Sequence, residues 1–121
     1  MIHSLGYLRI WEARTLFRDV FAILERGGVL VIETPDLGKC MGLALRCEAD
    51  EIPYLEAVRA IYGFGAGHEQ RRERFQPYAF GWAGWHLRKE LLEAGFSKVS
   101  LLPPQQHDAR VLRDIRVEAE K

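Results

Sequence analysis

The chain has 121 residues, of which 48% are hydrophobic and 28% are charged, a composition typical of one globular domain. Lysine and arginine together number 17, as do aspartate and glutamate, so the formal net charge is zero. No overall positive field would therefore attract nucleic acid or an anionic membrane. No apolar run approaches the ~18 residues of a membrane-spanning helix, and the N-terminus lacks the basic segment of a signal peptide. We expect a single domain, residues 1–121, located in the cytoplasm.

The clearest predicted element covers residues 11–26, where apolar side chains recur at steps of three and four. Charged residues occupy the opposite side, so the pattern predicts an amphipathic helix with one buried face. Gly27-Gly28 follows, and we expect it to end the helix because glycine adopts the left-handed cap conformation at low cost. The apolar positions are Ala13, Leu16, Phe17, Val20, Phe21 and Leu24.

The next element is a predicted strand over residues 29–34. The sequence here is a continuous apolar and β-branched run that stops at Pro35. Such a run is typical of a strand covered on both faces. A helix, a Gly-Gly turn and a buried strand in this order indicate the α/β class.

Three further segments lie between residues 36 and 77. Residues 36–47 predict a loop with a short helical piece, and residues 48–62 predict a second helix. Residues 63–77 are rich in glycine, then charged, and end at proline, so we expect an exposed loop. The apolar face of the second helix would consist of Ile52, Leu55, Val58 and Ile61.

The last elements are a helix and two strands. We predict a third helix over residues 82–94, ended by Gly95, and a short strand over 97–102 that Pro103-Pro104 closes. Residues 113–119 alternate apolar and polar side chains, which predicts a half-exposed strand of the kind found in antiparallel pairing.

Three glycines at alternate positions, Gly63, Gly65 and Gly67, form a pattern found in cofactor-binding loops. Such a loop follows a strand and opens a helix, whose N-terminal N–H groups then face the ligand. Here a predicted helix precedes the glycines, and no apolar periodicity follows them. We therefore interpret the glycines as a helix cap followed by a loop, in preference to a cofactor site.

Several stretches together carry a family resemblance. The ordered set HSLGYL, ILERGGVLVIETPDL, AIYG, LRKELLEAGFSKV and RVEAEK resembles the C-terminal half of class I S-adenosylmethionine-dependent methyltransferases, in particular the small-molecule methyltransferases. The resemblance covers residues 2–120 and is sharpest over 24–36 and 91–99. It implies an α/β fold: an incomplete Rossmann-like methyltransferase fold, with a small mixed sheet, an antiparallel last strand and flanking helices.

The resemblance also implies where a cofactor would bind. In the family, S-adenosylmethionine is held mainly by the N-terminal half, and we expect this chain to begin within the fourth strand of the complete fold. The residual cofactor-binding residues implied here are His3, Ser4, Leu5 and Tyr7. The family often has an H-x-L-E-H pattern at this place, whereas Gly6 and Tyr7 stand where it has Glu-His. We expect the isolated chain to bind the cofactor negligibly.

Other chemistry-bearing residues have two possible interpretations. The histidines and cysteines could bind a metal, but their spacing matches no zinc motif, which favours surface or packing roles. Arg71–Arg74 could bind an anion, although a solvated loop is the stronger interpretation. The histidines and cysteines concerned are His68, His86, His107, Cys40 and Cys47.

An aromatic cluster precedes the predicted third helix. It could form the wall of a substrate pocket, while a core cluster at the helix start is the favoured alternative. Spacing alone identifies no catalytic residue. The members of the cluster are Tyr78, Phe80, Trp82 and Trp85.

Two functional hypotheses follow. In the first, the chain is part of a methyltransferase that acts when the N-terminal half is supplied. In the second, it is a non-catalytic binding or structural protein that self-associates. We expect a homodimer, because the strand at 29–34 would be an uncovered edge and Trp11, Phe17 and Phe21 would need cover.

Overall fold

A computed structural model describes residues 4–46, 51–64, 76–106 and 113–121. Its main sheet contains three strands in the order β1-β5-β4: β1 (Val29–Pro35), β5 (Asp114–Glu120) and β4 (Lys98–Leu102). Both pairings are antiparallel, so β1 and β4 point one way and β5, between them, points the other. The α/β class and the antiparallel last strand are thereby confirmed, with strand bounds within a residue or two of those predicted. The predicted sheet is mixed, whereas the described three-stranded sheet contains antiparallel pairings alone.

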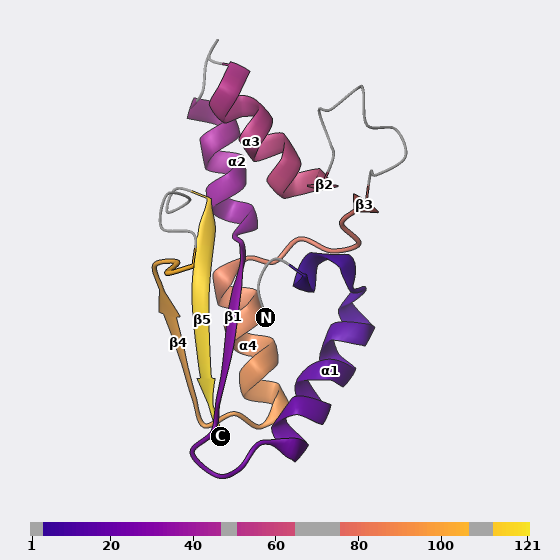
Figure 1. Ribbon diagram of the computed structural model, residues 1–121, viewed down its shortest axis with the longest axis vertical. Helices are drawn as coiled ribbons and strands as arrows, with labels where there is room; N and C mark the ends of the chain where they lie inside the picture. Colours follow the sequence, from indigo (N-terminus) through magenta and orange to yellow (C-terminus); the bar gives the residue numbers. More distant parts are fainter. Residues whose placement is uncertain (1–3, 47–50, 65–75, 107–112) are drawn as a thin grey trace.

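Two helices pack against one face of this sheet (Figure 1). These are α1 (Ile10–Ile23) and α4 (Gly84–Ala94). A second pair, α2 (Leu37–Arg46) and α3 (Glu51–Tyr62), forms a hairpin beyond the carboxyl end of β1. The hairpin therefore lies at the end of the sheet where open α/β folds bind their ligands.

The core between the sheet and these two helices follows from the strand register. Ile32 on β1 lies opposite Val117 on β5, and both side chains are fully buried against α1 and α4. Phe17 makes an edge-to-face contact with Trp82, with ring centroids 5.9 Å apart, and Phe21 makes one with Phe96 at 5.3 Å. These aromatic contacts are part of the apolar core between the sheet and the two helices.

The expectation that Phe17 and Phe21 need cover from a second copy is wrong. Phe17 is 1% exposed and Phe21 is partly buried, because α4 and the turn at Phe96 already pack over them. Of the three aromatic residues of α1 concerned, Trp11 alone is exposed, at 59%.

The expected cover of β1 on both faces holds only toward its carboxyl end. Val29, at the start of the strand, is 47% exposed, whereas Glu33 and Thr34 are buried although their side chains point to opposite faces.

Helix α1 ends earlier than predicted. Its last residue is Ile23, Leu24 has extended backbone angles, and Gly27, with φ of +82°, forms the turn into β1. The ammonium group of Lys121 donates hydrogen bonds to the carbonyl oxygens of Phe21 and Leu24 at 2.6 and 2.8 Å. Lys121 therefore satisfies backbone carbonyls at the end of α1, where the sequence predicts a cap at Gly27-Gly28.

The hairpin is the main departure from the predicted secondary structure. Residues 36–47 were expected to be mostly loop, but Leu37–Arg46 is a ten-residue helix. Gly38 and Gly42 lower the helix propensity of this segment, and packing against α3 overrides that preference. The predicted second helix is confirmed as α3, with its start at Glu51.

The third predicted helix is confirmed as α4, which begins two residues late and ends at Gly95 as expected. Gly95 has a φ of +117°, and an added Cβ there would lie 2.9 Å from the ring of Phe21. Only glycine fits both the backbone angle and the space.

Short elements complete the described chain. A 3₁₀ turn, η1 (Leu5–Tyr7), precedes α1, and two-residue strands β2 (Gly63–Phe64) and β3 (Gln76–Pro77) pair with each other. The expected loop 63–77 thus has a short strand pair at its ends. Within the residues that the structure describes, no helix is both long and apolar enough to cross a membrane. The cytoplasmic location stays a prediction.

Candidate functional site

The carboxyl end of β1 brings three parts of the chain together through Asp36. One carboxylate oxygen of Asp36 accepts a hydrogen bond from the backbone N–H of Lys39 at 3.0 Å, and the other accepts one from Gly84 at 3.0 Å. The backbone N–H of Asp36 donates to the carbonyl oxygen of Arg113. Asp36 therefore caps the starts of α2 and α4 and ties both to the start of β5.

The implied cofactor segment lies beside this end of the sheet, and its members differ in position. Ser4 is exposed, Leu5 is fully buried in the core, and Tyr7 is partly buried. His3 lies outside the described residues. Of the four residues, the structure thus places Tyr7 and Ser4 where their side chains reach the surface.

Gly6 fixes this segment against the chain that leads into α4. Its carbonyl oxygen accepts hydrogen bonds from the N–H groups of Ala79 and Phe80 at 2.7 and 3.2 Å. An added Cβ on Gly6 would lie 2.8 Å from the ring of Tyr78. The ring of Tyr7 lies 4.8 Å from that of Tyr78. The glycine that stands where the family often has glutamate is therefore required by the close approach of Tyr78.

The aromatic cluster before α4 is divided between core and surface. Trp82 is 1% exposed and belongs to the core, as the favoured interpretation expects, whereas Trp85 is 70% exposed. The ring of His86 lies between them, with centroids 5.4 Å from each. Tyr78, Phe80 and Trp82 also line a small cavity at the carboxyl end of β1, while the interpretation as a substrate-pocket wall stays a prediction.

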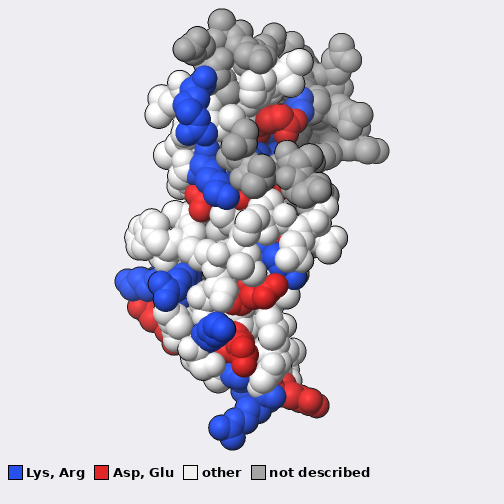
Figure 2. All heavy atoms as spheres, turned by 90° about the vertical axis from the view of Figure 1, so that its left-hand side faces the viewer, with Lys and Arg blue, Asp and Glu red and all other residues white. Residues whose placement is uncertain are grey.

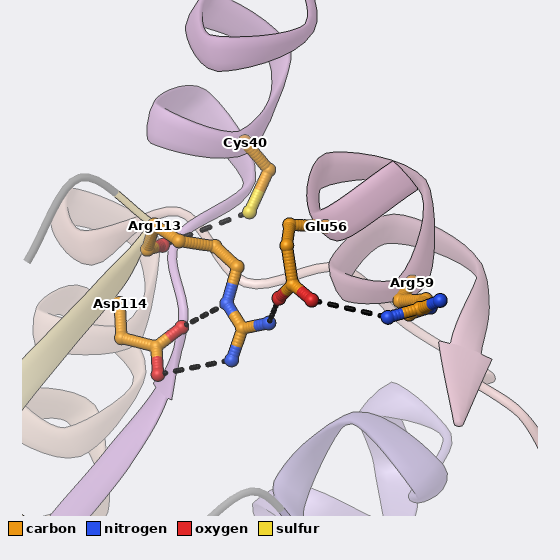
Figure 3. Close-up of polar contacts among 5 residues, drawn as sticks. All are labelled: Cys40, Glu56, Arg59, Arg113 and Asp114. Carbon is orange, nitrogen blue, oxygen red and sulfur yellow. Dashed lines mark hydrogen bonds and ion pairs between the residues drawn. The ribbon is translucent and has the colours of Figure 1, made fainter. Parts of the chain in front are cut away.

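A polar cluster joins the hairpin to the sheet (Figure 3). The guanidinium of Arg113 donates to both carboxylate oxygens of Asp114, at 2.7 and 3.3 Å, and to Glu56 of α3 at 3.1 Å. Glu56 also accepts a hydrogen bond from Arg59 at 3.1 Å. Opposite charges therefore compensate one another where α3 meets the start of β5, and Asp114 itself is fully buried.

Cys40 belongs to the same cluster but is chemically inert. Its Sγ lies 3.6 Å from the carbonyl oxygen of Arg113 and acts as a hydrogen-bond donor. Burial, the largest influence, raises the pKa of the Cys40 thiol to about 12. The thiol therefore stays protonated near neutral pH and is a poor nucleophile and a poor metal ligand.

The residues considered for a metal site do not gather in the part of the chain that the structure describes. Cys40 lies at the hairpin, while His86 on α4 contacts Glu90 at 3.2 Å. No group of three potential metal ligands occurs among the described residues. The other candidates, Cys47, His68 and His107, lie outside them, as do Gly65, Gly67 and Arg71–Arg74.

The described surface carries mixed charge. Figure 2 shows basic and acidic side chains interspersed along one side of the molecule. On β5, Arg116 contacts Glu118 at 2.9 Å, so adjacent charges of opposite sign offset one another. The expectation that nucleic acid and membranes are not partners stays a prediction.

Sequence reasoning missed the residues that build this end of the molecule: Asp36, Glu56, Arg113 and Asp114. Asp36 carried a readable signal, because an aspartate after a strand and before a helix is a favoured N-cap. The ion pair between Arg113 and Glu56 joins positions 57 residues apart, and a single sequence holds no sign of such a pairing.

Comparisons with known proteins address the fold. No protein-family model matches the sequence, and no curated protein matches it. Among solved structures, a "putative O-methyltransferase" from Nostoc punctiforme PCC 73102 matches all of this chain with a TM-score of 0.58 at 13% identity. The chain spans 30% of the length of that protein. At this identity the likeness shows the fold alone, which is methyltransferase-like.

Proposed function

We propose that residues 1–121 form, as one domain, the C-terminal half of a class I S-adenosylmethionine-dependent methyltransferase fold. The observation that carries the proposal is the position of β5, the last strand, antiparallel between β1 and β4. The antiparallel direction of this strand is what the resemblance implies for the last strand of the fold. The likeness to the Nostoc protein supports a methyltransferase-like fold.

The two outer strands of the sheet support a further part of the proposal. Lys98 begins β4 and Pro103-Pro104 follows it, and such residues protect a strand edge from pairing. The first four residues of β1 carry neither charge nor proline. We infer that β4 is a terminal strand, whereas β1 is an interior strand that a further strand adjoins in the complete fold.

S-adenosylmethionine in this proposal is bound mainly by strands that precede the equivalent of β1. Those strands belong to a preceding segment of a longer polypeptide or to a separate chain. The residues of this chain that would adjoin the cofactor are His3, Ser4, Leu5 and Tyr7. Leu5 can contribute only backbone groups, because its side chain is buried in the core.

The alternative is a non-catalytic protein that self-associates through β1 as a homodimer. The exposure of Val29 and Trp11 favours it, since both apolar side chains would gain cover from a second copy. In this alternative the chain needs neither cofactor nor methyl acceptor.

Calorimetric titration of the 121-residue chain with S-adenosylmethionine tests the proposal. We expect no saturable heat at micromolar cofactor, because most of the contacts would be supplied from outside these residues while the ordering cost of binding remains. Saturable micromolar binding would show that these residues hold a complete cofactor site. Sedimentation of the same sample separates the two functions, since a stable dimer without cofactor affinity supports the non-catalytic alternative.

A further inference from the structure

A buried hydrogen-bond donor at the carboxyl end of β1 lacks a partner. Among the described residues, two buried side-chain N–H groups donate no hydrogen bond: Nε1 of Trp82 and Nε of Arg59. An unpaired buried donor is uncommon in a folded protein and indicates a missing acceptor. Trp82 is 1% exposed, so bulk water does not supply that acceptor.

The orientation of the Trp82 indole is fixed by its neighbours. His86 stacks on it, with ring centroids 5.4 Å apart and planes inclined by 29°. Phe80 and Phe17 contact it edge-to-face at 4.8 and 5.9 Å. The backbone on the same residue is also held, because the carbonyl oxygen of Trp82 accepts the N–H of Leu37 at 2.8 Å. The N–H group is therefore a preorganised donor that cannot turn toward another acceptor.

Trp82 lines a cavity of about 10 Å³, close to the smallest volume that holds one water molecule or one ligand oxygen. Ala60 and Ile61 also line the cavity. These two residues follow Arg59, which carries the second unpaired donor, on α3. None of the lining side chains is ionised at neutral pH. They include Thr34, Leu37, Ile61, Tyr78, Phe80 and Trp82.

The surroundings favour a neutral acceptor over an anion. Burial is the main cause that raises the pKa of Tyr78 to about 12, so negative charge is disfavoured at the wall of this cavity. The rings of Tyr78 and Phe80 are only partly buried and offer apolar contact beside the cavity. A ligand with a carbonyl or ether oxygen attached to an apolar body offers both the uncharged acceptor and the apolar contact with these rings.

We propose that this cavity binds the hydrogen-bond acceptor of a small neutral apolar ligand, with the indole N–H of Trp82 as the donor. The acceptor oxygen occupies the cavity, and the apolar body contacts Tyr78 and Phe80. Binding requires no methyl donor, so the site can be tested separately from methyl transfer.

The test uses two probes of similar shape, acetophenone and ethylbenzene, of which only the first has a carbonyl oxygen. Nuclear magnetic resonance of the ¹⁵N-labelled 121-residue chain follows the indole N–H signals. We expect acetophenone to shift the Trp82 signal downfield saturably, and to bind about tenfold more tightly than ethylbenzene because of one added hydrogen bond. The signal is identified by its loss in Trp82→Phe.

Two variants separate the indole donor from general aromatic contact. Trp82→Phe keeps an aromatic ring but removes the donor, so the preference for acetophenone should disappear. Trp85→Phe changes an exposed tryptophan outside the cavity and should leave the preference unchanged.

Three results in the unaltered chain overturn the proposal without any variant. These are equal affinity for the two probes, a shift confined to the signals of Trp11 or Trp85, and a Trp82 signal that neither probe moves. The last result would indicate that a water molecule is the acceptor in the cavity. Absence of S-adenosylmethionine binding in the calorimetric titration affects none of these outcomes.

Discussion

At the scale of single residues, Glu33 shows how a carboxylate inside the fold is stabilised. Its side chain is fully buried and accepts hydrogen bonds from the backbone N–H groups of Gln105 and Gln106, at 2.6 and 3.0 Å, and from Arg116 at 3.2 Å. Burial acts to raise the pKa of Glu33, but these donors together outweigh it and hold the pKa below its usual value. The charged carboxylate thereby ties the segment after β4 to β1.

We therefore predict a pH-dependent effect of Glu33→Gln. Because the folded pKa is depressed, the stabilisation is present above the pKa of the unfolded chain and is lost as the pH falls through the folded pKa. At pH 7 the variant should lose about 1–3 kcal/mol of unfolding free energy, and the difference should shrink in acid. Urea denaturation at a series of pH values from 7 into acid measures this difference in unfolding free energy. Glu120→Gln, on the exposed end of β5, should show no comparable loss, and an equal loss in both would contradict the prediction.

Two glycines give a matched pair for a second residue-scale prediction. An alanine Cβ at position 6 would lie 2.8 Å from the ring of Tyr78, so Gly6→Ala should lower the unfolding free energy by about 1–3 kcal/mol. At Gly42, within α2, the nearest atom is the flexible end of Arg46 at 3.0 Å. Gly42→Ala should therefore raise stability by about 0.5–1 kcal/mol. Thermal unfolding of the two variants tests the opposite signs, and two changes of the same sign would contradict the close contact at Gly6.

At the scale of elements, the hairpin of α2 and α3 differs from the rest of the fold because it contributes nothing to the described hydrophobic core. Its fully or nearly buried side chains are small, namely Cys40, Ala57 and Ala60. Its attachment to the sheet is largely polar, through Asp36 and the cluster around Arg113. Segments with few buried apolar contacts open at lower free energy than a core.

We predict that Glu56→Ala loosens the hairpin selectively. Arg113 would keep Asp114 but lose its link to α3, at a cost of about 1 kcal/mol. Amide hydrogen exchange in α2 and α3 should then accelerate about five- to tenfold, while exchange in β1 and β5 stays unchanged. The control is Glu93→Ala, which removes an exposed contact to Lys89 on α4. Uniform acceleration throughout the chain would contradict a separately opening hairpin.

At the scale of the whole molecule, the two outer strands should respond differently to an added charge. If copies of the chain self-associate through β1, Val29→Lys should raise the dissociation constant at least about tenfold, because lysine at a strand edge opposes pairing. Ser100→Lys places the same charge on β4 and should leave self-association unchanged. Analytical ultracentrifugation measures both. A monodisperse monomer of the unaltered chain at high micromolar concentration would exclude the homodimer.

Much of the element-scale description could be read from the sequence. The periodicity of residues 11–26 and the apolar run from Val29 express local rules of amphipathicity and strand composition, and the structure bears out both elements. The antiparallel last strand followed from the resemblance together with the alternation at 113–119. Gly95 ends α4 as expected because its cap depends on backbone angles that only neighbouring residues set.

The sequence by itself thus determined the α/β class, the order of the principal elements and the zero net charge, since these depend on residue type and local spacing. The tertiary structure alone decided that Arg113 pairs with Glu56, that Gly6 approaches Tyr78, that Lys121 covers the end of α1, and that residues 37–46 are helical. It also decided that Trp82 is buried, that its N–H is unpaired and that the residue lines a small cavity. The physical reason is that each of these features depends on the distance between groups far apart in the chain, and such distances are set only when the layers pack together.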